Sequence, residues 1–390
     1  MTTDNSPSER RYDLVVFGAT GFTGKLVAEY LAASSETFSW AIAGRSADKL
    51  ADVKSELDLG DDVGLIAADS ADRASLAAMA ADTRVVLTTV GPYQKFGAPL
   101  VAACVEAETD YVDITGEPEF VNGVIERHDE VAQDRRLRIV NCCGFDSIPH
   151  DLGAYMVAQA LPDDASVTIQ GFVSASGKIS GGTWQSAVNA MGRARQQLRG
   201  PRRPASDGRK VRGLKTRAHY EKAVKGWVAP MPTIDPQIVL RSARALATYG
   251  REFRYGHYVR VGSLPRLMGL GVGVGSVFAL AQLPPTRKML LKMRQSGAGP
   301  TPEERARSKF RVTFVGRAGD QRVLGEASGG DPGYGETSKM VAESALCLAL
   351  DRDQLPEHFG VITPAVAMGD RLLERLRAAG MRFEILSQSA

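Results

Sequence analysis

The sequence predicts an α/β protein, with an N-terminal doubly wound parallel sheet followed by a second, α+β domain. Near the N-terminus, a short apolar strand runs directly into a glycine-rich turn and a helix. Short apolar strands then alternate with helical segments, which is the pattern of a parallel sheet covered by helices. After residue 151 this alternation ends, and longer strands with polar–apolar alternation begin.

The glycine-rich stretch Tyr12–Gly24 organises the first domain. Leu14–Phe17 is an apolar run typical of a buried strand, and Gly18, Gly21 and Gly24 follow it at G-x-x-G-x-x-G spacing. Such glycines let the chain leave the strand sharply, bring backbone N–H groups close to a pyrophosphate and let the helix pack on the sheet. This context predicts a Rossmann-type dinucleotide site, rather than a purely structural turn. Its predicted binding residues are Gly18, Thr20, Gly21, Phe22, Thr23 and Gly24.

The second strand, within Trp40–Ser46, ends where this fold places the adenine ribose. An NAD site usually has an acidic residue there, whereas this chain has Arg45 and Ser46, with Lys49 one helical turn further on. A guanidinium can bind a 2′-phosphate that a carboxylate would repel. The sequence therefore predicts NADP(H) rather than NAD(H), with a solvated Arg45 as the alternative. Ser46 is also the expected N-cap of a helix over 47–57.

The third strand, 63–68, ends at Asp69 and Ser70, which the fold position places near the adenine. The fourth strand, 84–90, runs into Gly91, Pro92 and Tyr93. This is the carboxyl edge of the sheet, where the nicotinamide half of the cofactor should lie.

The rest of the first domain, 1–150, continues the alternation. The expected elements are a helix over 99–107, a strand over 109–114, a helix over 119–135 and a strand over 138–142. Because strand-end loops gather at one edge of such a sheet, we expect Tyr93, Glu117, Asp146 and His150 to converge on one crevice.

The second domain is expected over 151–335, and C-terminal helices over 336–390 should pack back on the first domain. Its expected elements are helices over 152–161 and 180–198, a strand over 166–174, a linker over 295–308, a hairpin of 310–316 and 322–327 around Gly319-Asp320, and a glycine-rich loop over 329–335. Further helices are expected over 337–350 and 363–379. The glycine-rich loop is either part of the substrate side or a plain connector.

Two stretches of the second domain suggest partners. The basic stretch 193–225 is either a solvated loop or a surface that attracts anionic lipid headgroups or an acidic carrier protein. The uncharged stretch 267–283 favours a buried core helix or a small-residue dimer seam. The alternatives are an interfacial segment or a wall for an acyl chain, and the flanking Arg260, Arg266, Arg287 and Lys288 leave membrane-surface docking open.

Composition narrows the function classes. A net charge of +3 gives no support for nucleic-acid binding. The four cysteines form no disulfide framework and no metal spacing, so we expect no metal and a reducing, cytoplasmic compartment, with peripheral contact at the inner face of the plasma membrane as an option. The polar first ten residues argue against a signal peptide.

Six segments together resemble the saccharopine dehydrogenase-like oxidoreductases, and among them the bacterial trans-acting enoyl reductases of glycolipid and polyketide assembly. These segments are GATGFTG (18–24), AGRS (43–46), TTVGPY (88–93), YVDITGE (111–117), CGFDSIPHDLG (143–153) and GGDPGY (329–334). The resemblance implies an NADPH-dependent reductase acting on an acyl thioester held by a polyketide synthase carrier domain.

Enoyl reduction requires a donor to the developing enolate oxygen and an acid for the α-carbon. Tyr93 is the first candidate for these roles and His150 the second, with Asp146 and Glu117 as orienting groups; Asp146 could equally be a turn or capping residue. A saccharopine-type amine dehydrogenase and a non-catalytic NADP- and lipid-surface-binding protein are the alternative functions. A homodimer is also open.

Overall fold

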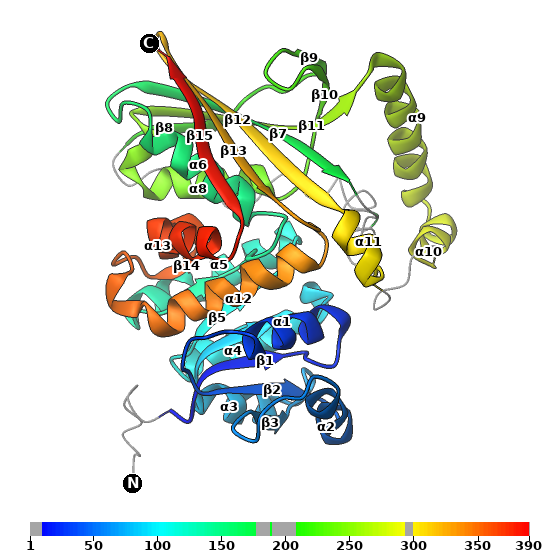
Figure 1. Cartoon of the computed structure of the whole chain (residues 1–390), viewed down its shortest axis with the longest axis vertical. Helices are drawn as coiled ribbons and strands as arrows, with labels where there is room; N and C mark the ends of the chain where they lie inside the picture. The colour runs from blue at the N-terminus through cyan, green and yellow to red at the C-terminus, as the bar shows by residue number, and fades with distance from the viewer. Residues whose placement is uncertain (1–9, 177–187, 189–207, 293–298, 390) are drawn as a thin grey trace. The chain divides into compact units, whose positions relative to one another are not determined.

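The computed structural model describes residues 10–176, 188, 208–292 and 299–389, and the chain forms two compact units (Figure 1). The first unit contains residues 1–144 and 337–375, and the second contains 145–336 and 376–390. The chain therefore passes into its second unit after Gly144, before the boundary expected at residue 150.

The first unit is built on a sheet of seven parallel strands within the described residues, in the order β14-β6-β5-β4-β1-β2-β3. This order confirms the doubly wound sheet. The strands are β1 (Tyr12–Phe17), β2 (Trp40–Gly44), β3 (Gly64–Ala67), β4 (Thr83–Thr88), β5 (Asp110–Asp113), β6 (Arg138–Val140) and β14 (Gly360–Ile362). The apolar run Leu14–Phe17 is buried along its whole length, as expected for a central parallel strand.

Seven α-helices and a short 3₁₀ turn belong wholly or mainly to this unit within the described ranges. They are α1 (Phe22–Ala32), α2 (Ala47–Glu56), α3 (Arg73–Ala81), α4 (Tyr93–Glu106), α5 (Pro118–Asp134), α12 (Gly335–Leu350), η3 (Arg352–Gln354) and α13 (Pro364–Ala378). Ser46 caps α2 as predicted, because its side chain accepts a hydrogen bond from the Lys49 backbone N–H.

The predicted start of α4 is wrong. The helix begins at Tyr93, so Pro99 lies inside it rather than in its first turn. The carboxylate of Glu117 makes this earlier start favourable, since it accepts hydrogen bonds of 3.0 Å from the backbone N–H groups of Tyr93 and Gln94.

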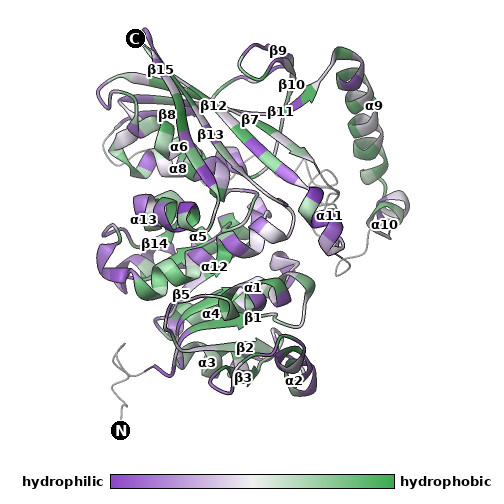
Figure 2. Cartoon of the chain, viewed as in Figure 1, coloured by the Kyte–Doolittle hydropathy of each residue, from purple (hydrophilic) through white to green (hydrophobic). Residues whose placement is uncertain are grey.

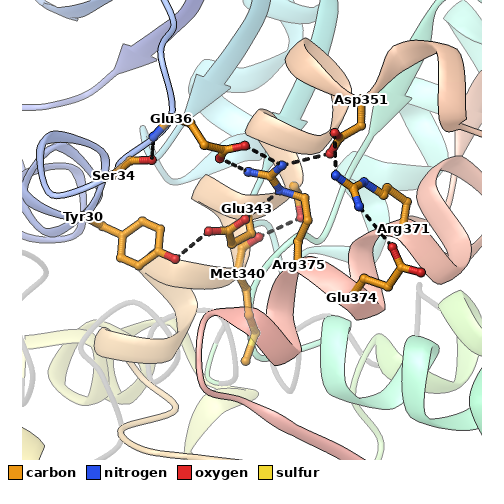
Figure 3. Close-up of polar contacts among 10 residues, drawn as sticks. Tyr30, Ser34, Glu36, Met340, Glu343, Asp351, Arg371, Glu374 and Arg375 are labelled. Atoms are coloured by element: carbon orange, nitrogen blue, oxygen red, sulfur yellow. Dashed lines mark hydrogen bonds and ion pairs between the residues drawn. The ribbon is translucent and has the colours of Figure 1, made fainter.

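A buried arginine joins the C-terminal helices to the rest of the first unit (Figure 3). Arg375 on α13 forms ion pairs with Glu343 on α12, with Asp351 and with Glu36, which follows α1. The hydroxyl of Tyr30 donates a second hydrogen bond to Glu343. Residues 337–375 belong to the first unit, and residues 376–390 belong to the second.

The second unit contains an eight-stranded mixed sheet in the described part of the chain, in the order β15-β13-β12-β7-β11-β10-β9, with β8 paired to β11. The strands are β7 (Ser166–Ser176), β8 (Lys210–Gly213), β9 (His219–Glu221), β10 (Gly226–Pro230), β11 (Glu252–Gly262), β12 (Lys309–Ala318), β13 (Gln321–Gly329) and β15 (Arg382–Ser389). The hairpin predicted around Gly319-Asp320 is confirmed, since β12 and β13 pair antiparallel across it.

The described helices of this unit are α6 (Ile148–Gln159), α8 (Asp235–Ala245), η2 (Ala247–Tyr249), α9 (Leu264–Ala281), α10 (Pro284–Lys292) and α11 (Pro302–Arg307). Helix α6 begins four residues before the predicted start at 152, which places Pro149 and His150 in its first turn. The predicted helix over 180–198 and the first half of the basic stretch lie outside the described residues, apart from Val188.

Three other expectations are corrected in the second unit. The final segment of the chain is a strand, β15, because its backbone completes the sheet along β13. Part of the expected linker is helix α11, whose N-terminus is capped by Thr301 and Glu304 in a capping box. The expectation of a buried core helix over the apolar stretch is wrong, because only 6% of helix α9 is buried, and the alternative of a dimer seam stays a prediction. Most of the α9 ribbon has the colour of hydrophobic residues in Figure 2.

Candidate functional site

The turn between β1 and α1 forms a tight cradle. Gly18 donates its backbone N–H to Ala43 O (2.9 Å) and accepts from Gly21 N (3.0 Å). Gly21 precedes α1 and has no side chain to cap it, so no side-chain hydrogen bond closes this helix N-terminus. Backbone N–H groups and the positive end of a helix dipole are the features that bind a pyrophosphate.

Two glycines of the cradle cannot carry a side chain without a shift in the backbone. Gly18 has a φ of +97°, and a Cβ there would lie 2.7 Å from a methyl carbon of Val90. At Gly24, a Cβ would lie 2.2 Å from the carbonyl oxygen of Gly18. The turn and the helix are thus held in van der Waals contact, as the glycine spacing predicts.

The residues predicted for the adenosine half follow the neighbouring strands. Arg45 is exposed directly after β2, as is Lys49 in the first turn of α2. Asp69 follows β3 by two residues, and its carboxylate accepts a hydrogen bond from the Ala71 backbone N–H, which folds a turn there. Ser70 is buried beside it. The roles of these residues toward the 2′-phosphate and adenine stay predictions.

Tyr93 does not present its hydroxyl to solvent. The residue is 5% exposed, and its hydroxyl donates a 3.0 Å hydrogen bond to the carbonyl of Thr88, at the end of β4. Burial, together with the nearby Asp113, raises the pKa of Tyr93 well above its usual value. The hydrogen bond connects the start of α4 to the end of β4. A buried hydroxyl whose proton is held in this way is poorly placed to act as the acid that the sequence predicted.

The YVDITGE run holds the carboxyl edge of the first sheet together. Asp113 accepts four hydrogen bonds, from the Tyr111 hydroxyl, the Asn141 amide and the backbone N–H groups of Thr115 and Cys142. Burial raises the pKa of Asp113 to about 6, although these four donors favour its charged form. With Glu117 capping α4, the acidic residues of this run have structural partners within the first unit.

The second unit contains a buried cluster of His150, Asp235 and His257. Nδ1 of His150 lies 3.2 Å from one oxygen of Asp235, and Nε2 of His257 lies 3.3 Å from the other. His150 stands on α6, Asp235 begins α8 and His257 is on β11, so the cluster joins three elements. All three side chains are at most 2% exposed.

Further polar partners complete this cluster. The Thr233 hydroxyl donates to Asp235, and the Tyr255 hydroxyl lies 3.1 Å from Nδ1 of His257. The Thr233 hydroxyl is the hydrogen-bond donor that the structure shows for the Asp235 carboxylate. Nδ1 of His150 and Nε2 of His257 lie close to that carboxylate but form no hydrogen bond within the described residues. A buried carboxylate requires hydrogen-bond donors, because its charge loses the solvation of water.

In and beside this cluster, the pKa values of two carboxyl groups, Asp235 and Asp146, are shifted in opposite directions. Burial lowers the pKa of His150 to about 4, so its ring is neutral at pH 7. Burial works to raise the pKa of Asp235, but the two histidines and Thr233 outweigh it and keep that pKa below its usual value. Burial, with the charge of Asp235 as the second cause, raises the pKa of Asp146 to about 7. Asp146 therefore exchanges its proton near neutral pH.

The cluster also has the composition of a cation site, since its ligand atoms lie within 4.8 Å of one another. The sequence predicted no metal because residues 150, 235 and 257 form no local motif. Each ring nitrogen faces a different oxygen of Asp235. Both nitrogens, and the Asp235 oxygen nearest His150, have no hydrogen-bond partner within the described residues.

Asp235 and His257 are the polar partners of His150 that sequence reasoning missed. A signal for Asp235 was present, since T-x-D-P (233–236) places an acid before a proline at the start of a helix. The only sequence signal for His257 was its position in a stretch where polar and apolar residues alternate as in a strand. The predicted crevice joins residues of both units, so it stays a prediction: Tyr93 and Glu117 belong to the first unit, and Asp146 and His150 belong to the second.

A doubly wound sheet with a glycine cradle, followed by a mixed-sheet unit with a buried acid–imidazole cluster, defines a dinucleotide-dependent oxidoreductase. Residues 14–138 match the family described as the saccharopine dehydrogenase NADP binding domain. The cofactor is therefore NADP(H), as the sequence predicted.

The relatives carry the identification further. A protein named trans-acting enoyl reductase from Mycobacterium bovis is 35% identical over 426 residues, covering 96% of this chain and 98% of that protein. One of the same name from Mycobacterium leprae is 34% identical, with the same coverage of both chains. A Mycobacterium tuberculosis protein reaches 39% identity over 96% of this chain and 97% of its own length. This chain belongs to the trans-acting enoyl reductase family.

A solved structure agrees with the fold. Saccharopine dehydrogenase (L-Glu forming) from Saccharomyces cerevisiae superposes with a TM-score of 0.56, covering 97% of this chain and 99% of that chain, at 12% sequence identity. At this identity the likeness shows the fold alone.

Proposed function

We propose that this NADP-dependent oxidoreductase reduces a carbon–carbon double bond next to the thioester of an acyl chain, which a polyketide synthase carrier domain holds during lipid or glycolipid synthesis. The names of the relatives and the NADP binding domain support this reaction. NADPH, when bound at the cradle of Gly18, Gly21 and Gly24, supplies the hydride.

The chemistry requires a protein acid that is protonated at neutral pH. Asp146 meets this requirement, because its pKa is raised to about 7 while that of neighbouring Asp235 is lowered. Two carboxyl groups whose environments separate their pKa values in this way commonly divide into an acid and a fixed charge. The likeness to proteins named trans-acting enoyl reductase carries the proposal, and this contrast makes Asp146 its candidate proton donor to the α-carbon.

His150 and Asp235 then have positioning roles. Burial is the main reason that Asp146 keeps its proton, and the charge of Asp235 adds to it. The ring of His150, on α6, lies 3.2 Å from the Asp235 carboxylate. The ring of Phe145 lies edge-on to His150 with centroids 5.6 Å apart, which excludes water from one side of the imidazole. Tyr93 is not assigned a proton-transfer step, because its hydroxyl proton is bound to Thr88.

The test uses the purified full chain, NADPH and a series of enoyl thioesters of increasing chain length. NADPH labelled with deuterium at C4, in ordinary water, should place one deuterium at the β-carbon of the product. Unlabelled NADPH in D₂O should place one deuterium at the α-carbon. Asp146→Asn should lower kcat by about 10²–10⁴-fold with little change in NADPH affinity, since a general acid contributes about this factor.

Asp163→Asn is the matched control, because Asp163 is an exposed carboxylate of the same unit and should leave turnover unchanged. If Asp146→Asn turns over like the wild type, Asp146 is not the acid. If enoyl thioesters fail but an amino acid and a 2-oxo acid together oxidise NADPH, the chain is an amine dehydrogenase. Tight NADPH binding without oxidation by either substrate class would identify a binding protein.

The same proposal includes an acidic carrier domain as the partner. The basic stretch 193–225 supports electrostatic attraction to an acidic carrier, and its described part, 208–225, includes strands β8 and β9. We also propose a cytoplasmic location, consistent with four buried cysteines that form no disulfide.

A further inference from the structure

Helix α9 exposes an apolar surface along most of its length. Its one buried residue, Ala281, lies at its C-terminal end and packs with Val188 and Leu290. Its 18 residues, Leu264–Ala281, have a mean hydropathy of 1.5, and 6% of them are buried. By length and composition, it is the one helix within the described residues that could cross a membrane. Met268 is 67% exposed and Val272 is 72% exposed, values usually found for charged side chains.

The exposed apolar side chains surround the helix instead of forming a stripe. Val272 and Val274 are two residues apart, so they point about 200° away from each other on a helix of about 3.6 residues per turn. Both are exposed, as are Leu270 and Phe278. A second protein surface would bury one face of such a helix and leave the other in water. A lipid phase covers all faces at once.

Three polar side chains of this segment donate hydrogen bonds to backbone carbonyls close by in the chain. Ser276 donates to the carbonyl of Val272 at 2.8 Å, and Gln282 donates to that of Phe278 at 3.2 Å. Thr286 donates to the carbonyls of Leu280 and Leu283. Internal pairing is what a hydrocarbon environment demands, because an unsatisfied polar group there costs several kcal/mol.

The charge pattern around α9 selects the kind of lipid. No aspartate or glutamate occurs from Phe253 to Pro302. The basic residues of the same stretch are Arg254, Arg260, Arg266, Arg287, Lys288, Lys292 and Arg294. Basic residues beside a membrane-active segment favour anionic headgroups, by about 1 kcal/mol for each one that reaches the surface.

Chain topology excludes a spanning helix. The segment leaves the sheet after β11 and returns to it at β12, and both strands pair with β7. One crossing would place these two strands on opposite sides of the bilayer. The following helix, α10, has nine residues and a length of about 14 Å, too short to return through a hydrocarbon core of about 30 Å. The helix must therefore enter and leave from the same side.

We propose that α9 lies in the surface of an anionic lipid bilayer and docks the enzyme there as a monotopic membrane protein. The helix lies parallel to the bilayer just below the headgroups of one leaflet, where acyl chains surround all its faces, and the flanking arginines and lysines extend to the headgroups. The proposal goes beyond the reductase reaction and does not depend on it.

Flotation of the full chain with vesicles tests this docking. The wild type should float with vesicles of 30% phosphatidylglycerol in phosphatidylcholine, and an increase from 50 to 500 mM salt should weaken binding without abolishing it. Val272→Asp combined with Phe278→Asp should lower the partition coefficient at least tenfold. Val131→Asp is the matched control, because Val131 is an apolar residue on α5 that is 40% exposed. Circular dichroism and NADPH binding verify that each variant is folded.

A second measurement distinguishes lying in the surface from spanning. Val272→Cys and Leu280→Cys provide single exposed thiols for a bimane label, since the four native cysteines are buried. Bromines near the headgroups should quench both labels similarly. Deep quenching at Val272 with a Leu280 label on the far side of the bilayer would overturn the monotopic arrangement. Failure to float, with a dimer that Val272→Asp dissociates, would instead show that a second copy covers α9.

Discussion

Replacing Gly24 with alanine tests whether close contact between helix and turn builds the NADP cradle. The new methyl carbon would lie 2.2 Å from the carbonyl oxygen of Gly18, 2.7 Å from its carbonyl carbon and 2.8 Å from the Cα of Ala19. Favourable contacts between carbon atoms begin near 3.5 Å, so α1 must move away from the turn by about 1 Å. All three obstructing atoms are backbone atoms, which a rotamer change cannot relieve.

The size of the effect follows from this overlap. Overpacking at a well-packed position costs about 1–3 kcal/mol, which corresponds to a factor of about 5–150 in an equilibrium constant. We expect Gly24→Ala to lower the free energy of unfolding by this amount and to weaken NADPH binding by a comparable factor. Urea unfolding and titration of NADPH fluorescence measure the two quantities.

Two control variants separate strain from contact with the cofactor. A Cβ on Gly21 would lie 3.3 Å from the same oxygen, so Gly21→Ala should weaken NADPH binding with little loss of stability. Gly269 on α9 has open space around it, so Gly269→Ala should leave NADPH binding unchanged and stabilise the helix by about 0.5–1 kcal/mol. Wild-type stability and NADPH affinity in Gly24→Ala would refute the close-packed cradle.

Four further predictions follow from single groups. Arg45→Ala should remove most of the preference for NADPH over NADH in a fluorescence titration, while exposed Arg127→Ala should retain it. Glu117→Gln should lower the free energy of unfolding in urea by about 1 kcal/mol, because the carboxylate that caps α4 loses its charge. Arg375→Met should lower it by about 3–5 kcal/mol, since Glu343 and Asp351 keep buried charges. If Asp146 is the acid, only its protonated form works, so kcat/KM should fall tenfold per pH unit above its pKa of about 7, and an unchanged rate at pH 8.5 would exclude it.

Features with a local cause could be predicted from the sequence. The cradle was predictable because the apolar strand, the three glycines and the amphipathic helix lie within one short stretch, and each constrains the next. The hairpin at Gly319-Asp320 was predictable for the same reason, since the turn residues and both alternating strands are adjacent.

Features with a distant cause could not be predicted. Helix α4 starts at Tyr93 because a carboxylate 24 residues further along the chain caps it. The three-residue strand β14 carries too little pattern of its own, and its pairing with β6 defines it. Composition alone could not settle the environment of α9, because a core helix and a lipid-bound helix have the same residues.

The two motifs that sequence reasoning joined into one catalytic crevice have different physical roles. In YVDITGE, the carboxylates of the buried Asp113 and of Glu117, which caps α4, accept hydrogen bonds from donors in the first unit. Both carboxylates therefore have structural roles. In CGFDSIPHDLG, burial and a neighbouring negative charge leave Asp146 with a proton that is held loosely near pH 7. A carboxylate that several donors satisfy stabilises a fold, whereas one destabilised by a neighbouring charge can deliver a proton. The sequence shows an acidic residue in both motifs, and only the partners in three dimensions decide which of them can do chemistry.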